Sequence, residues 1–403
     1  MNKTKIVTLA LAVLLLSGCL GIRMTASAET GSELYDADFS ERDLSGAYDN
    51  EIFTITLNDT DIQTDSNNVK ISGSVITITG AGTYILTGTL DNGCVIVDAA
   101  KEDKIQLVLS GVSIHSDSSA AICILQADKV FVTLADGTVN ALSSGGFSRI
   151  DDIEADAVIF SKDDLTLNGS GTLQIVSPAG HGIVCKDDLK ITGGVYTIQA
   201  AQSAVKAKDS IAVADGSFTL RAGADGLHAE HSDDDTLGNI LISGGSFDIQ
   251  AADDAVHANT LLRIDSGSFD IIASEGFEAT YIQINGGSIR ISAADDGINA
   301  ARKSSAYTPT VEINGGEISV SMGAGDTDSV DSNGDLIIRG GTVSVTGNSA
   351  FDYDGTATYT GGTIIVNGQQ VDSIPNQMMG GRGGMMGGGM MGGNPGMHGK
   401  NGW

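Results

Sequence analysis

The chain of 403 residues has few positive charges. Lys and Arg number 22 against 51 Asp and Glu, for a formal net charge of −29. A surface this acidic repels nucleic acids and anionic membranes, which excludes phosphate recognition as the basis of function, so no nucleic-acid partner is expected. Acidic polysaccharides are repelled as well, unless cations bridge the two surfaces.

Helical periodicity is also missing. After residue 30 no segment sustains an apolar repeat of about 3.6 residues, whereas apolar and polar residues alternate almost everywhere, which indicates β structure. Aromatic side chains make up only 5% of the chain. Flat binding to crystalline cellulose uses rows of exposed aromatic rings, so this mode of binding is disfavoured.

Cysteine is scarce, with four residues in the whole chain. Cys94, Cys123 and Cys185 each lie in an apolar segment, and none has C-x-x-C spacing. An odd number of thiols in an exported chain cannot all pair internally, and zinc sites need closely spaced ligands. We therefore expect three buried, unreactive thiols.

The apolar run near the N-terminus, residues 6–16, is too short to span a bilayer, which takes about 20 residues. It follows a basic start and predicts a signal peptide over residues 1–18. The sequence LSGC that ends at Cys19 resembles a bacterial lipobox, so we expect lipidation of Cys19 and a lipid-anchored protein on the cell membrane, facing the cell exterior or cell wall. The alternative is cleavage after the small residues 26–28 and simple secretion.

Glycine is abundant, with 54 residues, and it marks an internal repeat. From residue 170 onward, glycine pairs or their equivalents precede short alternating segments such as SGGSFDI and NGGSIRI. The second glycines fall at Gly171, Gly194, Gly216, Gly245, Gly267, Gly287, Gly316, Gly341 and Gly362. A repeat of about 22 residues made of short strands and sharp glycine turns predicts an all-β fold, a single-stranded parallel β-helix.

The repeat also defines the domain organisation. The pattern extends back to about residue 50, so the predicted β-helix spans residues 50–374, after a tether over residues 19–49. Two longer repeats contain insertions at residues 228–239 and 299–310, and insertions in a solenoid gather on one face, often the binding face. Residues 375–403 are a Gly/Met-rich tail that we expect to be disordered.

Alignment of the repeats by their glycines places acidic residues at one position in successive coils. This first position holds Asp156, His181, Ser203, Asp225, Asp254, Glu275, Asp296, Asp328 and Ser349. Three residues further on, the second position holds Ile159, Val184, Lys206, His228, His257, Glu278, Asn299, Asp331 and Asp352. The apolar residue between the two positions should point inward, so both positions are expected to lie near a bend and open to solvent.

Carboxylates stacked about 4.8 Å apart repel one another unless a cation lies between them. Calcium binds oxygen at about 2.3 to 2.6 Å, so two oxygens on either side of one ion match this spacing. We therefore expect Ca²⁺ as the cofactor. Its candidate ligands are Asp225, Asp254, Glu275, Asp296, Asp328, Glu278, Asn299 and Asp331, with Asp233 and Asp235 of the first insertion as candidates for another ion. The alternative is that these residues only form turns.

The segments AGTYILTGTL, NGCVIVDA, IQLVLSGVSI and AAICILQADKVFVTLADGTVNAL, within residues 81–142, resemble a family of secreted, often lipid-anchored carbohydrate-binding domains. The resemblance covers residues 50 to 370. It implies a right-handed, pectate-lyase-like parallel β-helix with bound calcium that binds plant-cell-wall polysaccharides such as polygalacturonate or cellulose, without assured enzymatic activity. His181 and Ser203 stand where the family pattern has Asp, so calcium is not expected at those coils.

The expected function is that of a calcium-loaded, monomeric cell-surface protein that binds polysaccharide, with acidic polygalacturonate-like chains favoured over cellulose. Tyr307 is the candidate sugar platform, and Arg290 a candidate contact for uronate carboxylates. One alternative is a calcium-dependent polysaccharide (pectate) lyase in which Lys206 acts as the base next to calcium at Asp225. The other alternative is a structural surface stalk or adhesin.

Overall fold

The computed structural model describes residues 34–48, 51–59, 61–147, 149–150, 153–323 and 327–376. The predicted signal peptide, Cys19 and the tail beyond residue 376 lie outside the described residues. The chain divides into two units, residues 1–35 and 36–403, and every described helix and strand belongs to the second unit. In the described part of the chain, no helix is both long and apolar enough to cross a bilayer.

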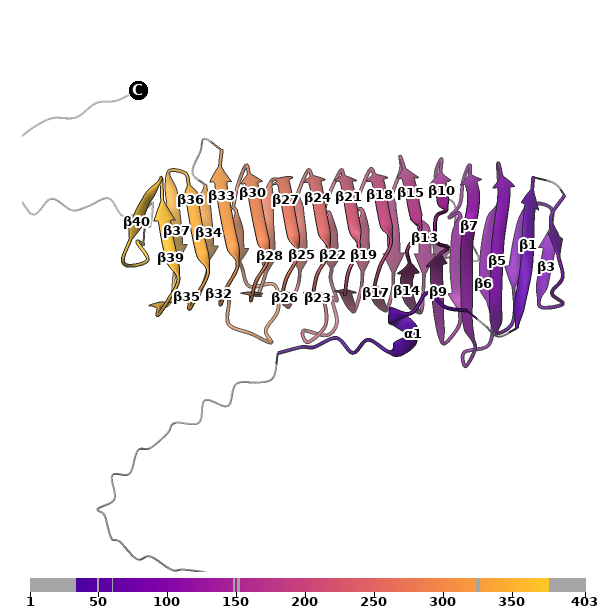
Figure 1. Ribbon diagram of the computed structural model, residues 1–403, viewed down its shortest axis with the longest axis horizontal. Coiled ribbons are helices and arrows are strands. Elements are labelled where there is room, and N and C mark those ends of the chain that lie inside the picture. Colours follow the sequence, from indigo (N-terminus) through magenta and orange to yellow (C-terminus); the bar gives the residue numbers. More distant parts are fainter. Residues whose placement is uncertain are drawn as a thin grey trace, which may run out of the picture. The chain divides into compact units, whose positions relative to one another are not determined.

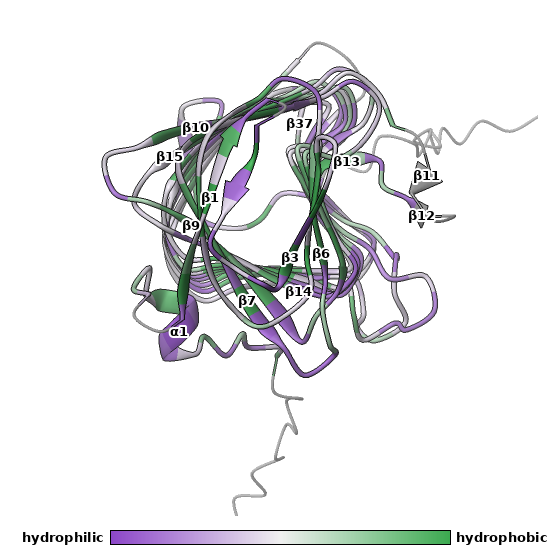
Figure 2. Ribbon diagram, turned by 90° about the vertical axis from the view of Figure 1, so that its right-hand side faces the viewer, coloured by the Kyte–Doolittle hydropathy of each residue, from purple (hydrophilic) through white to green (hydrophobic). Residues whose placement is uncertain are grey.

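Short strands stack in parallel from coil to coil and form a parallel β-helix (Figure 1), as predicted. One coil consists of β24 (Ser246–Ala251), β25 (Asp254–Ala258) and β26 (Leu261–Ile264), which pair with β27, β28 and β29 of the next coil. Viewed along the stack, the coils superimpose and their strands form the faces of one tube (Figure 2).

One face is a 13-stranded sheet, which we call the acid face because it carries the aligned acidic positions. Its strands are β3 (Val69–Ser72), β4 (Val75–Ile78), β6 (Cys94–Asp98), β8 (Ile122–Gln126), β13 (Ala157–Ser161), β16 (His181–Cys185), β19 (Val205–Ala207), β22 (Leu227–Ala229), β25, β28 (Glu275–Ala279), β31 (Ile298–Ala300), β34 (Asp328–Ser332) and β37 (Ser349–Tyr353).

The other two faces belong to a 25-stranded sheet that branches at β7 (Lys104–Ser116), because this long strand pairs with both β9 and β10. The first branch comprises β9 (Lys129–Leu134), β14 (Asp164–Gly169), β17 (Asp188–Ile191), β20 (Ser210–Val213), β23 (Asn239–Ile242), β26, β29 (Tyr281–Ile284), β32 (Thr310–Ile313), β35 (Asp335–Ile338) and β38 (Ala357–Tyr359). The second comprises β10 (Val139–Ser144), β15 (Thr172–Ser177), β18 (Val195–Ala200), β21 (Ser217–Ala222), β24, β27 (Ser268–Ala273), β30 (Ser288–Ala293), β33 (Glu317–Met322), β36 (Thr342–Thr346), β39 (Thr363–Val366) and β40 (Gln369–Val371). At the start lie β1 (Ile52–Asn58), β2 (Gln63–Thr64) and β5 (Gly82–Leu90), and β11 (Arg149–Ile150) pairs separately with β12 (Ile153–Glu154).

A column of aromatic rings lies within a core that is mostly aliphatic. Tyr196, Phe218, Phe247 and Phe269 stack from coil to coil with ring centroids 5.1, 4.7 and 4.6 Å apart. These rings occupy the same position in successive strands, as parallel register requires. None of the large apolar side chains that are exposed in the described residues is aromatic, so no row of exposed rings is available there for binding flat cellulose.

The repeat glycines have the predicted role. Gly245 has a φ of +104°, and a Cβ added there would lie 3.0 Å from the carbonyl oxygen of Gly216 in the preceding coil. Positive φ recurs at Gly194, Gly216, Gly267, Gly287, Gly316, Gly341 and Gly362. A side chain at these positions is disfavoured both by the backbone conformation and by the neighbouring coil. Gly171 is the exception, since the positive φ in that coil belongs to Gly169.

Part of the predicted tether is instead packed on the β-helix. The short helix α1 (Glu41–Leu44) lies against the first branch near β9 and β14 (Figure 1). Asp43 of α1 is fully buried, with Lys129 Nζ 2.8 Å and Lys190 Nζ 3.6 Å from its carboxylate oxygens. Thr166 Oγ1 donates a hydrogen bond of 2.7 Å to the same carboxylate. The sequence does not reveal this contact, because Thr166 lies more than a hundred residues away along the chain.

Candidate functional site

The register of the acid face follows the predicted alignment over most of its length. The second position pairs in the order Lys206, His228, His257, Glu278, Asn299, Asp331 and Asp352. The apolar residues between the two positions are fully buried, as predicted: Leu227, Val256, Phe277, Ile298 and Val330. Residues that lie far apart in the sequence, in successive repeats, are therefore direct neighbours on one face.

The alignment is wrong by one residue in one coil. Ala157 pairs with His181 and Phe160 with Val184, so Asp156 and Ile159 do not hold the two positions. The segment that carries β11 and β12 enters the chain directly before this strand. The spacing from the glycines therefore does not determine the register there.

The expectation that both positions are open to solvent is also wrong for part of the face. Asp225, Asp254, Glu278 and Asn299 retain only 4 to 8% of their accessible surface. Each side chain is covered by its neighbours in the coils on either side, and Lys303 of the second insertion reaches Glu278. Burial of a carboxylate requires compensating partners, and the partners differ along the face.

A histidine neutralises the centre of the acid face. His257 Nδ1 lies 2.6 Å from Asp254 Oδ2 and 2.8 Å from Glu278 Oε2, and these three residues each offer a ligand atom within 4.8 Å of the others. Burial by itself would lower the pKa of His257, but the hydrogen bonds to the two carboxylates outweigh it and raise the pKa to about 10. Lys303 Nζ lies 2.8 Å from Glu278 Oε1. The protein thus places its own cations where the sequence predicts calcium at Asp254 and Glu278.

Asp225 is also occupied by protein partners. Its Oδ2 lies 2.7 Å from His228 Nδ1 and accepts a hydrogen bond of 3.1 Å from Ser203 Oγ. Its Oδ1 accepts a longer bond of 3.3 Å from the amide of Asp254. The His228 ring stacks on His257 with centroids 4.7 Å apart. In this arrangement the oxygens of Asp225 are used within the protein.

The end of the acid face nearer the C-terminus differs, because three of its carboxylates have no cationic partner among the described residues. Within the described residues, Glu275, Asp296 and Asp331 form no ion pair at 4.0 Å or less, and their contacts are hydrogen bonds from neutral groups. Asn299 Nδ2 donates a bond of 3.0 Å to Glu275 Oε2, and the amide of Asp328 donates one of 3.0 Å to Asp296 Oδ1. Burial and neighbouring carboxylates raise the pKa of Glu275 to about 8, of Asp296 to about 6 and of Asp331 to about 7.

Four buried oxygens at this end lack hydrogen-bond partners among the described residues: Asn299 Oδ1, Thr327 Oγ1, Ser349 Oγ and Asp352 Oδ1. Asn299 and Asp352 lie on either side of Asp331 in the second-position row. Buried polar atoms are almost always satisfied by protein, water or an ion, so two unsatisfied oxygens next to unpaired carboxylates indicate a missing partner. All donors here are oxygen, the set that calcium prefers, so the chemistry of this end fits calcium, although no three of its carboxylates in the described residues lie within 4.8 Å of one another. We call Glu275, Asp296, Asn299, Asp331 and Asp352 the unpaired end of the acid face.

The two insertions meet each other. The backbone oxygen of Asp235 accepts hydrogen bonds from Thr260 Oγ1 at 2.9 Å and from Ser304 Oγ at 2.6 Å, and the Asp235 carboxylate accepts one from the amide of Ser305 at 3.2 Å. Asp233 is exposed, and its amide donates to His231 Nδ1. The contacts of Asp235 therefore hold the two loops together, and no set of three metal ligands in the described residues includes Asp233 or Asp235.

The structure does not bring together the remaining predicted site residues, which are Tyr307, Arg290 and Lys206. Tyr307 is half-buried in the second insertion, with its ring 5.4 Å from that of Tyr281. Arg290 lies on the second branch, is largely exposed and is 3.9 Å from Asp270, so it belongs to another face. Lys206 lies on the acid face, and its Nζ is 3.7 Å from Glu230. It pairs in register with His228 and not with Asp225.

Sequence reasoning missed a second group of carboxylates at the edge of the acid face. Asp164, Asp187 and Asp188 place one oxygen each within 4.8 Å of one another. Burial and the neighbouring aspartates raise the pKa of Asp187 to about 6. The repeats SKDD, CKDD and AKDS, at residues 161–164, 185–188 and 207–210, were the signal for it. The same repeats contain a lysine at each turn.

Comparison with known proteins identifies the class. Residues 72–327 match the model of a family described as carbohydrate-binding domain-containing proteins, and the chain belongs to this family. A carbohydrate-binding domain-containing protein of Acetivibrio thermocellus is 39% identical over 137 residues, which cover 33% of this chain and 48% of that protein. The chain thus spans about half the length of this curated relative.

A solved structure is also similar in part. It is a gadolinium derivative of the polysaccharide lyase-like protein from C. thermocellum, with 24% identity and a TM-score of 0.40. The match covers 79% of this chain and 95% of that one.

Proposed function

We propose that this protein binds an acidic polysaccharide of the polygalacturonate class through calcium ions held at the unpaired end of the acid face. The observation that carries the proposal is the pair of buried, unsatisfied oxygens of Asn299 and Asp352 on either side of Asp331, whose carboxylate forms no ion pair in the described residues. The residues proposed to hold calcium are Glu275, Asp296, Asn299, Asp328, Asp331 and Asp352. Asp225, Asp254 and Glu278 are left out, since His228, His257 and Lys303 already compensate them.

Calcium would supply positive charge between the protein and the glycan. The chain carries a net charge of −29, so a polyuronate is repelled unless cations lie at the contact. A calcium ion takes six to eight oxygen ligands, about twice what two or three side chains supply. Carboxylate and hydroxyl oxygens of the sugar can complete the shell. Neutral crystalline cellulose gains nothing from this arrangement, and the aromatic rings that would bind it are stacked in the core.

We also propose that the protein acts outside the cell, tethered by a lipid on Cys19. The support is the basic start, the apolar run of residues 6–16 and the LSGC sequence. Polysaccharide of the cell exterior is then within reach of the acid face.

Affinity electrophoresis through a gel that contains polygalacturonate tests the function. In calcium, the wild-type protein should be retarded, and Asp331→Asn should weaken the retardation about tenfold, because a loss of about 1.4 kcal/mol changes affinity by that factor. Asp253→Asn is the matched control, since Asp253 is an exposed acid on a neighbouring coil. Equal retardation of Asp331→Asn and wild type, or no retardation of either, would refute calcium-bridged binding of this glycan.

The same samples distinguish a lyase from a binding protein. β-Elimination produces an unsaturated uronide with a characteristic ultraviolet absorbance, and a base must lie next to the metal-bound carboxylate for this reaction. Lys206 lies four coils from Asn299 in the register of the acid face and contacts Glu230. We therefore expect retention without product.

A further inference from the structure

Lysines occupy one turn position in three successive coils next to the acid face. Ser161 pairs with Cys185 and Cys185 with Ala207, so the following residues, Lys162, Lys186 and Lys208, are stacked. The amide of Lys186 donates to the Ser161 oxygen, and the amide of Lys208 donates to the Cys185 oxygen. Stacked ammonium groups about 4.8 Å apart repel one another just as stacked carboxylates do. In a chain with 51 acidic and 22 basic residues, this row concentrates positive charge at one turn position, although an aspartate follows each of the three lysines.

A cavity of about 260 Å³ opens at this row. Its lining includes Lys186, Lys206 and Lys208, with Glu230 as the one acid. Lys206 Nζ lies 3.7 Å from Glu230, which is about half exposed, so this ion pair is weak. In the described residues, no carboxylate lies within 4.0 Å of the ammonium groups of Lys186 or Lys208; that of Lys186 lies 5.8 Å from the centroid of the Phe160 ring.

The positive charge of these lysines also affects His181, which lies near the cavity but not in its lining. Burial lowers the pKa of His181, and Lys206 and Lys186 lower it further, although Asp156 opposes them. His181 lies on β16, one coil before Lys206 on β19. The lining of the cavity itself combines three ammonium groups with one carboxylate.

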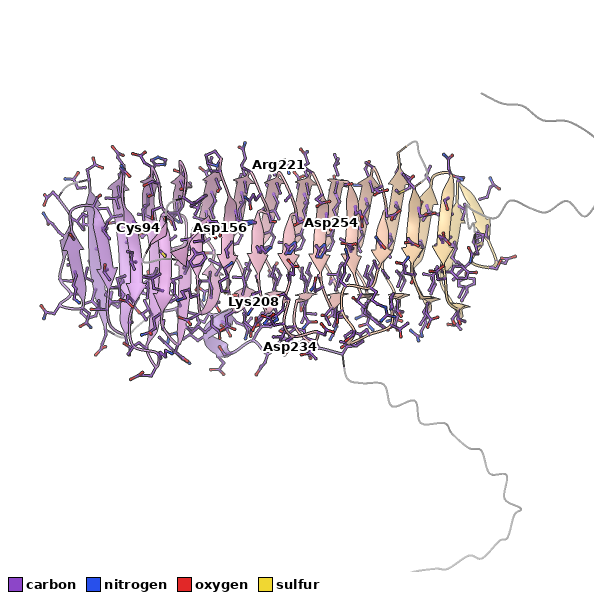
Figure 3. The ribbon with its side chains drawn as sticks, turned by 180° about the vertical axis from the view of Figure 1, so that it is seen from behind. Cys94, Asp156, Lys208, Arg221, Asp234 and Asp254 are labelled. Carbon is purple, nitrogen blue, oxygen red and sulfur yellow. The ribbon has the colours of Figure 1, made fainter. Side chains whose placement is uncertain are left out.

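We propose that this cavity is an anion subsite that binds a uronate carboxylate of the glycan directly, without calcium. This inference rests on the proposed function, because it assigns a second contact to the same acidic polysaccharide. Ammonium groups are the natural partners of carboxylates, and the size of the cavity suits one sugar residue. Figure 3 places Lys208 toward the edge of the molecule that bears Asp234 of the first insertion, and Arg221 at the opposite edge.

The position of the subsite defines the direction of the glycan. Lys206 and Asn299 share the second position four coils apart, so they lie about 19 Å apart along the stack at about 4.8 Å per coil. A polyuronate that contacts both the cavity and the unpaired end must run parallel to the axis of the β-helix. The glycan would then contact calcium at the unpaired end and lysine side chains at the cavity.

Binding of fluorescently labelled trigalacturonate to the full-length chain, followed by anisotropy in excess chelator, tests the subsite separately from calcium. We expect binding by the wild type and a loss of about tenfold or more in Lys186→Gln/Lys206→Gln/Lys208→Gln, since each charged contact contributes a factor of a few. Lys70→Gln/Lys101→Gln/Lys104→Gln, with the same change in charge on exposed lysines of the first coils, should bind like the wild type. The methyl ester of trigalacturonate should not bind.

Lys208→Arg retains the charge and should bind within about twofold of the wild type, which separates loss of charge from damage to the fold. Binding of the triple pocket variant within twofold of the wild type overturns the subsite, and so does a wild type that does not bind the trisaccharide in chelator. Failure of the proposed function looks different. In that case polygalacturonate does not retard the protein in calcium, or Asp331→Asn does not weaken its retardation.

Discussion

The state of each polar residue of the acid face follows from the side chains that it contacts in its own coil, in the next coil or on an insertion. His257 is the clearest case. It stands between Asp254 and Glu278, and it replaces a metal ion there with an imidazolium. Asn299, one coil beyond Glu278, donates its amide group to Glu275 and leaves its own oxygen unsatisfied. The change from paired to unpaired chemistry therefore occurs within a single coil.

Substitution of His257 by Gln tests the pairing. It leaves buried Asp254 without a cation and Glu278 with Lys303 alone, and removal of one partner of a buried ion pair costs about 3 to 5 kcal/mol of unfolding free energy. The folded-state pKa of His257 is raised to about 10, so its contribution is fully present below the unfolded pKa of about 6.5 and is lost as the pH rises through 10. Denaturant unfolding of both proteins at pH 6, 8 and 10 measures this.

The difference in stability between wild type and His257→Gln should be largest at pH 6 and smallest at pH 10. Lys70→Gln, an exposed lysine far along the chain, serves as the control and should show no such trend. An equal difference at all three pH values would mean that His257 is not protonated in the folded protein.

Among the elements, α1 and the two insertions do not follow the repeat, and they pack on the β-helix or on each other. α1 docks on the first branch through the buried Asp43 carboxylate and through hydrogen bonds from Asn168 and Thr192 to its backbone, and the two insertions contact each other through Asp235 and Ser304. The periodic glycines and the alternation within strands predicted the coils and their register from Lys206 to Asp352. Asp43 and Lys303 could not be predicted as partners of Lys129 and Glu278, because neither lies in a repeated position.

Replacement of Asp43 by Asn should release α1 from the sheet. Hydrogen bonds and Lys129 hold the pKa of Asp43 well below its usual range, although burial opposes them. The stabilisation is therefore present above the unfolded pKa of about 3.9 and is lost as the pH falls below it. We expect a loss of about 3 kcal/mol at pH 7, because the ammonium group of Lys129 is left without its buried partner.

Hydrogen exchange of the amides of residues 41–44 and unfolding at pH 7 and pH 3 measure this release. The amides should exchange faster in Asp43→Asn, and the two proteins should become more similar in stability at pH 3. Asp38→Asn, on an exposed residue of the same segment, should have no effect. Unchanged protection in Asp43→Asn would show that other contacts hold the helix.

In the molecule as a whole, the excess of acidic residues and the stacking of coils bring carboxylates close together, and only some of them meet a cation of the protein. A chain of net charge −29 places its carboxylates on a repeating scaffold, neutralises part of them with His257 and Lys303, and leaves Glu275, Asp296 and Asp331 without an ion pair in the described residues. The sequence predicted the row of acidic residues but not which of them are paired with cations. Composition and repeat length do not show which carboxylate contacts a lysine or histidine of the protein. That knowledge requires the contacts between coils and the loop that covers them.

Calcium and glycan should strengthen each other's binding if the ion bridges the protein and the sugar. The dissociation constant of calcium is measured by calorimetry for the full-length wild-type chain, with and without a saturating oligogalacturonate, after subtraction of calcium binding by the free oligosaccharide. Linkage requires that each ligand raise the affinity for the other by the same factor, and calcium affinity should rise at least about fivefold. An unchanged calcium affinity, or no calcium binding at all, would show that calcium does not bridge the acid face and the glycan.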